Sequence, residues 1–275
     1  MTLRAITGML LIMVILLCIT AEGYWFSGLW LVFMAVAFYE SYSFQGDRAL
    51  RWPCILASLV WLLGCLSYLF FSNLWYLNFT SVAAIALYFT LGCFFLSEDG
   101  IQAKFRDFST SMTLFIYVGV FYTPILVLAG SLSEPKSVLL FLFALFWLQD
   151  SFSYLGGRFF GKHPLAPVLS PKKTWEGAVI GLVLALVTLY FLAPLFPSRI
   201  GNWILVYGFL VGVSGQVGDL IESGIKRSFQ IKDSGAFFPG HGGVLDRFDS
   251  VTAGSIVLMG LFLPDLVSTG LLTKS

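Results

Sequence analysis

About nine runs of mostly apolar residues fill this chain, and they restrict its possible folds more than any other feature. A helix needs roughly 20 such residues to cross the hydrocarbon core of a bilayer. Charged residues make up 11% of the 275 residues, and the mean hydropathy is +0.87. A soluble domain has roughly 25% charged residues, so the composition excludes a soluble enzyme, a disordered protein and a free nucleic-acid-binding protein. We predict an all-α polytopic membrane protein with spans near residues 4–21, 24–44, 52–71, 74–97, 108–130, 137–156, 175–195, 201–222 and 249–270.

The basic residues between these spans are distributed unequally between the two sides. The N-terminus and every second loop after it carry thirteen of the 16 Lys and Arg residues: Arg4, Arg48, Arg51, Lys104, Arg106, Arg158, Lys162, Lys172, Lys173, Lys226, Arg227, Lys232 and Arg247. The opposite side carries Lys136, Arg199 and Lys274. Because basic loops remain in the cytoplasm, the distribution predicts a cytoplasmic N-terminus and an outside C-terminus, in an inner or plasma membrane. The first helix is expected to be retained, since its apolar stretch is long and ends in a poor signal-cleavage site.

The spans define two regions. Residues 1–140 are predicted to form five transmembrane helices, and residues 141–275 a C-terminal transmembrane region that carries the chemistry. The cytoplasmic loops 157–174 and 223–248 are the longest and most polar. Cysteines occur only within apolar runs and form no CxxC pair, which favours a packing role over a disulfide or zinc site. These are Cys18, Cys54, Cys65 and Cys93.

Carboxylates in apolar spans are rare, because an ionisable group at mid-bilayer costs roughly 2.5–3.5 kcal/mol or more. Here they are Glu40, Asp150, Asp219, Glu222 and Asp249. All lie near the predicted cytoplasmic ends of their spans. This placement favours a site at headgroup depth over an ion pathway. Glu40 has no basic partner within a helical turn, and we interpret it as snorkelling to the interface.

Two basic segments are candidates for phosphate binding. Asp150 precedes Gly156-Gly157-Arg158, a cluster that could cradle a phosphate, although glycines also end helices. In the second segment, Ser170 before Pro171 is typical of a helix N-cap. Lys172, Lys173 and Thr174 would then lie in the first turn, where free N–H groups favour anions. The alternative function of these lysines is a positive-inside anchor.

The stretch from Asp219 to Asp249 has the highest density of charged residues. Asp219, Ser223 and Lys226 are spaced i, i+4, i+7 and would share a face of a continuous helix. Asp246 and Asp249 are spaced i, i+3. Carboxylates among lysines and arginines suit a magnesium–phosphate site, because hard oxygen ligands hold the cation and basic groups hold phosphate oxygens. Mutual ion pairing, such as Asp246 with Arg247 or Lys226 with Asp219, is the alternative.

This stretch resembles the signature of the phosphatidate cytidylyltransferases, roughly S-x-x-K-R-x-x-x-K-D, a spacer and P-x-H-G-G-x-x-D-R-x-D. The matching residues, in order, are Ser223, Lys226, Arg227, Lys232, Asp233, Pro239, His241, Gly242, Gly243, Asp246, Arg247 and Asp249. The segments 150–162 and 170–177 are similar to other motifs of the family, so the specific resemblance covers roughly the C-terminal half. It implies a multi-pass enzyme that joins CTP to phosphatidate at the cytoplasmic side, giving CDP-diacylglycerol and pyrophosphate. It also implies magnesium dependence, allows potassium as a second ion, and implies a homodimer in the lipid bilayer without a nucleic-acid partner.

The residue roles are hypotheses that follow from this resemblance and from the residue types. The metal ligands are expected to be Asp219, Asp246 and Asp249. The catalytic residues are expected to be Asp219, Asp246, Lys226, Arg227 and His241. The substrate-binding residues are expected to be Ser223, Lys172, Lys173, Thr174, Asp150, Arg158, Lys232 and Arg247. The main alternative function is a secondary transporter that uses intramembrane carboxylates, which the clustering of charge on one side and the missing internal repeat disfavour.

Overall fold

The computed structural model describes residues 2–21, 24–43, 51–71, 74–94 and 101–268. Within this part of the chain, the regular elements are helices apart from one short hairpin, as the apolar runs predict. Arg48 and Lys274, which contribute to the predicted orientation, lie outside the described residues. The chain divides into two compact units: residues 1–132, 234–244 and 264–275 form unit 1, and residues 133–233 and 245–263 form unit 2.

Unit 1 contains five long helices and a loop from the signature region. The helices are α1 (Thr2–Thr20), α2 (Trp25–Ser43), α3 (Arg51–Phe71), α4 (Leu74–Phe94) and α5 (Ile101–Ser131). Aromatic side chains join α2 to α5: the ring of Trp30 stacks on Tyr122 with centroids 5.5 Å apart, and its indole N–H donates to the Tyr122 carbonyl at 2.9 Å. The buried indole is therefore satisfied inside an otherwise apolar core.

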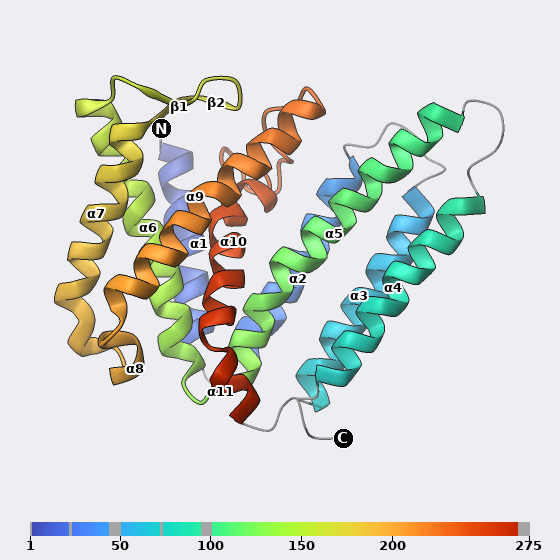
Figure 1. Cartoon of the computed structure of the whole chain (residues 1–275), viewed down its shortest axis with the longest axis horizontal. Helices are drawn as coiled ribbons and strands as arrows, with labels where there is room; N and C mark the ends of the chain where they lie inside the picture. The colour runs from blue at the N-terminus through green and yellow to red at the C-terminus, as the bar shows by residue number, and fades with distance from the viewer. Residues whose placement is uncertain (1, 22–23, 44–50, 72–73, 95–100, 269–275) are drawn as a thin grey trace. The chain divides into compact units, whose positions relative to one another are not determined.

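Unit 2 contains the remaining long helices and the hairpin (Figure 1). Its elements are α6 (Pro135–Phe160), β1 (Pro164–Ala166), β2 (Ser170–Thr174), α7 (Trp175–Leu192), the 3-10 turn Ala193–Leu195, α8 (Ser198–Gly201), α9 (Ile204–Ser228) and α10 (Leu245–Leu261). The two strands are antiparallel, with Pro164 opposite Thr174. The hairpin joins the end of α6 to the start of α7.

Glycines allow the helices of unit 2 to approach closely. A Cβ at Gly181 of α7 would lie 2.8 Å from the Gln149 carbonyl of α6, and one at Gly177 would lie 2.8 Å from the Ser153 carbonyl. A Cβ at Gly218 of α9 would lie 3.0 Å from the Asp249 carbonyl of α10. Such small residues are typical of helix packing in membranes, where lipid gives no hydrophobic drive for association.

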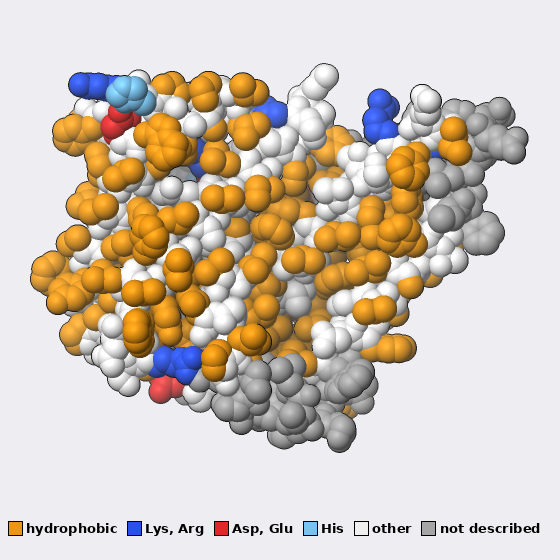
Figure 2. Space-filling model, in the orientation of Figure 1, with side chains coloured by type: hydrophobic (Ala, Val, Ile, Leu, Met, Phe, Trp, Pro, Cys, Tyr) orange, Lys and Arg blue, Asp and Glu red, His pale blue; other side chains and the backbone are white. Residues whose placement is uncertain are grey.

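The helix surfaces agree with a membrane environment. Within the described residues, five helices are long and apolar enough to cross a bilayer, namely α3, α5, α6, α7 and α9. On α7, Val179, Val183 and Val187 form an exposed stripe at i, i+4, i+8, and Figure 2 shows hydrophobic side chains over α7 and α9. An apolar surface of this kind requires hydrocarbon around it. The chain is thus a membrane protein, while the count of nine spans and the orientation stay predictions.

Each predicted span contains a helix in the described part of the chain, but several boundaries differ. α6 and α9 continue to Phe160 and Ser228, so the loops expected at 157–174 and 223–248 are shorter. The expected last span, 249–270, is divided between α10 and α11 (Leu263–Ser268). The break lies at Phe262, two residues before Pro264, because a proline has no N–H to donate to the carbonyl four residues earlier and its ring crowds that carbonyl.

Candidate active site

The functional residues of unit 2 come from the ends of α6 and α9, the strand β2 and the start of α10. α9 is continuous through the charged segment, so Asp219 and Ser223 share a helix face as predicted. The Ser223 hydroxyl donates to Asp219 Oδ1 at 3.4 Å. Lys226 lies further along the same helix and forms different pairs from those considered in the sequence analysis.

The segment 170–174 is a strand and not the first turn of a helix, which corrects the predicted N-cap. Ser170–Thr174 pairs with β1, and α7 begins at Trp175. The N-cap is Thr174, whose hydroxyl accepts from the Gly177 N–H at 3.2 Å. The strand at 170–174 is explained by its partner β1, which satisfies its backbone groups. The Ser170-Pro171 pattern is local and gives no information about this pairing with another strand.

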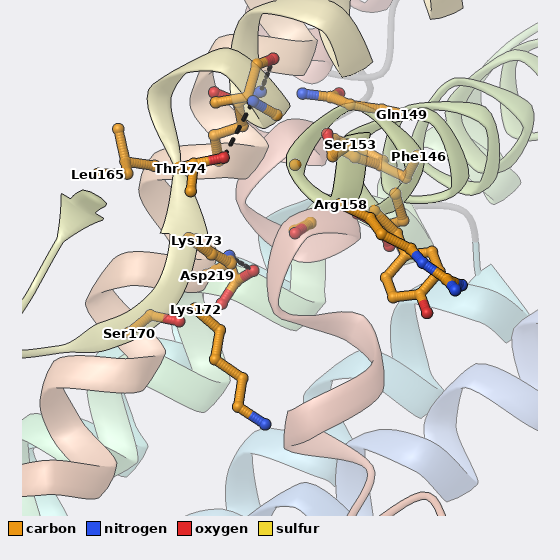
Figure 3. Close-up of a pocket in the computed structure, with 17 residues that line it drawn as sticks. Phe146, Gln149, Ser153, Arg158, Leu165, Ser170, Lys172, Lys173, Thr174 and Asp219 are labelled. Atoms are coloured by element: carbon orange, nitrogen blue, oxygen red, sulfur yellow. Dashed lines mark hydrogen bonds and ion pairs between the residues drawn. The ribbon is translucent and has the colours of Figure 1, made fainter. Parts of the chain in front are cut away.

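Two lysines hold the carboxylates of the site. Lys173 Nζ forms an ion pair with Asp219, which Figure 3 shows as a contact between β2 and α9. Lys226 Nζ bridges Glu222 and Asp246, with 2.7 Å to Asp246 Oδ1. The side chains of Glu222 and Asp246 are 2% and 5% exposed. Ion pairing therefore does occur, but with other partners than the Asp246–Arg247 and Lys226–Asp219 pairs considered from the sequence.

Burial and nearby carboxylates act in opposite directions on Lys173. Burial lowers the pKa of its ammonium group from the ordinary value, and the nearby carboxylates of Asp249 and Asp150 oppose that change. A cation that is partly desolvated interacts more strongly with an anionic ligand than one in bulk water.

A cavity of about 510 Å³ lies beside these groups in unit 2. Its charged lining consists of Asp150, Arg158, Lys172, Lys173 and Asp219. Apolar groups, among them Phe146 and Leu165, form other parts of its wall. In Figure 3, the Lys172 side chain extends away from the Lys173–Asp219 pair, so the two neighbouring lysines reach different places. The volume is in the range of small-molecule sites.

The cavity also has polar lining residues that the sequence analysis missed. Gln149 is 2% exposed and its amide donates to the Gly212 carbonyl at 3.2 Å. Gln216 donates to the Ala178 carbonyl at 3.0 Å, and Ser153 also lines the cavity. The amide side chains of Gln149 and Gln216 within apolar spans were the sequence signal for these cavity residues. Uncharged groups are less distinctive in such spans than carboxylates.

The predicted basic residues also include Arg227, Lys232 and Arg247, whose surroundings differ from those of Lys173. Arg227 donates to the carbonyls of Leu169 and Ile231, at 3.3 and 3.0 Å, and so holds the backbone of the β1–β2 connection. Lys232 and Arg247 are exposed. His241 belongs to the loop 234–244 of unit 1, and its backbone N–H donates to the Phe238 carbonyl at 2.9 Å.

The carboxylates provide the donor chemistry for magnesium, which binds oxygen ligands. Asp219, Asp246 and Asp249 all belong to unit 2, and Asp249 Oδ1 accepts from the Ser250 N–H at 2.7 Å. Within the described residues, however, no three His, Cys, Asp or Glu side chains are grouped closely enough to hold one metal ion. The lysine ammonium groups instead neutralise Asp219 and Asp246. Carboxylate oxygens are donors that fit magnesium. For magnesium to bind, Lys173 and Lys226 would have to release Asp219 and Asp246.

A comparison with known proteins shows the family to which the chain belongs. The model of the cytidylyltransferase family matches residues 2–263. The chain belongs to the cytidylyltransferase family. The match includes the N-terminal helices as well as the charged segments of unit 2, so in this cytidylyltransferase both units are part of the family's common architecture.

Individual relatives agree with this assignment. The chain is 42% identical over 148 residues to a phosphatidate cytidylyltransferase of Staphylococcus saprophyticus, which covers 54% of this chain and 56% of the relative. It is 36% identical over 177 residues to the enzyme of that name from Staphylococcus haemolyticus, covering 64% and 66%. The relative of that name from Staphylococcus aureus is 40% identical over 148 residues, with 54% and 56% covered. The matched segments thus span a little over half to about two thirds of these relatives.

Proposed function

We propose that this cytidylyltransferase transfers the cytidylyl group of CTP to phosphatidate, producing CDP-diacylglycerol and pyrophosphate for phospholipid synthesis. The observation that carries the proposal is the cavity of unit 2, whose wall combines basic side chains with apolar ones at the ends of apolar helices. One substrate is a lipid that stays in the bilayer and the other is a nucleotide that stays in water. A site at the ends of membrane helices can take both. The names of the relatives support the choice of substrates.

The reaction forms one bond and breaks one. A phosphate oxygen of phosphatidate attacks the α-phosphorus of CTP, and the bond from that phosphorus to the bridging oxygen of the β-phosphate breaks. Pyrophosphate leaves with the electron pair. Since a phosphomonoester has its second pKa near about 6, the nucleophile is largely a dianion at neutral pH and needs no strong general base. The main barrier is repulsion between two anions, so charge neutralisation and alignment are the expected means of catalysis.

Basic residues of unit 2 would supply that neutralisation. Lys172, Lys173 and Arg158 line the cavity and are proposed to hold phosphate oxygens. Lys226 would stabilise the leaving pyrophosphate after release from Asp246. The remaining proposed contacts are those of Asp150, Thr174, Ser223, Arg227, Lys232, His241 and Arg247 with the nucleotide or the lipid headgroup.

Magnesium is proposed as the cofactor. Asp219, Asp246 and Asp249 would hold it, and when bound it would neutralise triphosphate oxygens. Potassium as a second ion belongs to the same proposal. We also propose a homodimer in the inner or plasma membrane, with the site facing the cytoplasm.

A product assay tests the function. The protein is purified in mild detergent and mixed with phosphatidate, magnesium and CTP labelled in the cytosine ring. We expect label to enter the lipid phase, with one pyrophosphate released per lipid product. Replacing CTP by ATP, or adding EDTA, should remove the transfer. A folded, monodisperse sample that transfers no label would contradict the proposal, and solute uptake by sealed vesicles would then favour the transporter.

A further inference from the structure

Glu40 contacts a part of the chain about 200 residues away in sequence. It lies near the end of α2 and is 4% exposed, which corrects the interpretation that it snorkels to the interface. Its Oε2 accepts from the Ser234 hydroxyl at 3.0 Å, and its Oε1 accepts from the Val244 N–H at 2.9 Å. Both partners belong to unit 1, as Glu40 does. A buried carboxylate is costly unless such donors compensate it.

The two partners are the first and last residues of the loop 234–244. This loop is itself a tight turn: the Phe238 N–H donates to the Gly242 carbonyl at 2.9 Å. Gly240 and Gly242 have φ values of 78° and 86°, a conformation that suits glycine. Glu40 therefore closes the base of a loop whose tip is already folded.

The loop is also shaped to receive the carboxylate. A Cβ at Gly235 would lie 2.7 Å from Glu40 Oε1, and a Cβ at Gly243 would also collide with the carboxylate. Glycines at these two positions therefore let the backbone approach Glu40. The ring of Phe238 packs edge-on against Phe33, with centroids 6.0 Å apart. Phe33 belongs to α2, as Glu40 does, so the loop contacts this helix at two positions.

We propose that Glu40 is a positioning residue for cytidylyl transfer, acting through the loop 234–244. The loop carries His241, and Val244 is bonded directly to Leu245, the first residue of α10. Asp246 in the first turn of that helix and Asp249 in the next turn are proposed metal ligands. Val244 directly precedes, along the chain, the helix that carries them, and Glu40 would act through this covalent connection. This inference rests on the proposed function.

Activity and hydrogen exchange of purified Glu40 variants test this role together. Glu40→Gln keeps the shape of the side chain and removes its charge, whereas Glu40→Ala removes both acceptors. We expect kcat to fall in the order wild type, Gln, Ala, with a loss of about 10²-fold for Ala, the size produced by small misplacements of reacting groups. Exchange of the peptide covering 234–244 should rise, while exchange of α4 stays unchanged. Ser41→Ala is the matched control, because Ser41 is buried beside Glu40 and its hydroxyl bonds within α2.

A double-mutant cycle separates positioning from general stability. Ser234→Ala removes one of the two hydrogen bonds and should lower kcat less than Glu40→Ala does. In the double variant the loss should be smaller than the product of the single losses, because both changes release the same loop. Wild-type kcat in Glu40→Ala, or exchange that rises equally in all helices, would overturn the proposal. If the wild-type protein transfers no label, the proposed function fails. Unchanged hydrogen exchange of the loop 234–244 in Glu40→Ala would separately refute the positioning role of Glu40.

Discussion

Lys226 illustrates at the residue scale why the charged groups of unit 2 suit a reaction more than stability. Its ammonium group is shared between Glu222 and Asp246, and all three side chains are mostly buried. Removing such charges from water costs several kcal/mol per ion, which their attraction offsets only with good geometry. Under the proposed function, Lys226 would exchange Asp246 for a phosphate oxygen.

Asp246→Asn is expected to lower kcat/KM by about 10²-fold or more, because the substitution removes a carboxylate that pairs with Lys226 and that we propose to hold magnesium. Folding should persist, since Lys226 keeps Glu222 as a partner. Steady-state kinetics in the labelled-CTP assay and a thermal unfolding curve measure the two quantities. Asp107→Asn serves as the control, because Asp107 pairs with Arg106 at the surface of α5. Wild-type kinetics in folded Asp246→Asn protein would exclude Asp246 from the site.

At the scale of elements, the approach of α7 to α6 decides where the lysines of β2 lie. Gly177 and Gly181 are spaced i, i+4 and let α7 lie against the backbone of α6. The strand β2 ends where α7 begins, so the helix contact also places Lys172 and Lys173. Glu176 in the first turn of α7 adds a second constraint, since it accepts from the Lys162 and His163 N–H groups at 3.1 and 3.2 Å.

Gly181→Leu is expected to separate α6 from α7, because even a Cβ there would lie 2.8 Å from the Gln149 carbonyl. Overpacking of this kind typically costs 1–3 kcal/mol. We expect a lower unfolding temperature and lower activity, both measured in detergent. Val179→Leu is the matched control on the same helix, because Val179 is 55% exposed on the apolar stripe. Equal unfolding temperatures for the two variants would contradict the packing argument.

For the whole molecule, the asymmetry of basic residues determines how the chain is expected to lie in the membrane. α6 alone makes the prediction concrete, since Lys136 lies at its start and Lys162 two residues beyond its end. If the positive-inside assignment holds, these two positions face opposite compartments. The site, at the Lys162 end of α6, would then face the cytoplasm, where the cell keeps its CTP.

Single cysteines at these two positions test the orientation. Lys136→Cys and Lys162→Cys are made separately in a variant without Cys18, Cys54, Cys65 and Cys93. An impermeant maleimide added to intact cells should label position 136 and leave position 162 unlabelled, and inverted vesicles should give the opposite result. The parent without cysteines controls for background. Labelling of position 162 in intact cells would reverse the predicted topology.

Apolar run length and helical spacing are local properties of the chain, so the sequence was enough to predict a helical membrane protein and the helix face that Asp219 and Ser223 share. Only the tertiary structure decided the partners of the charges. Lys173 reaches Asp219 because β2 pairs with β1, and Glu40 is buried because a loop 194 residues away folds over it. Pairing between distant segments depends on packing of the folded chain, which local spacing does not encode. That is why the sequence located the charged groups and the fold assigned their contacts.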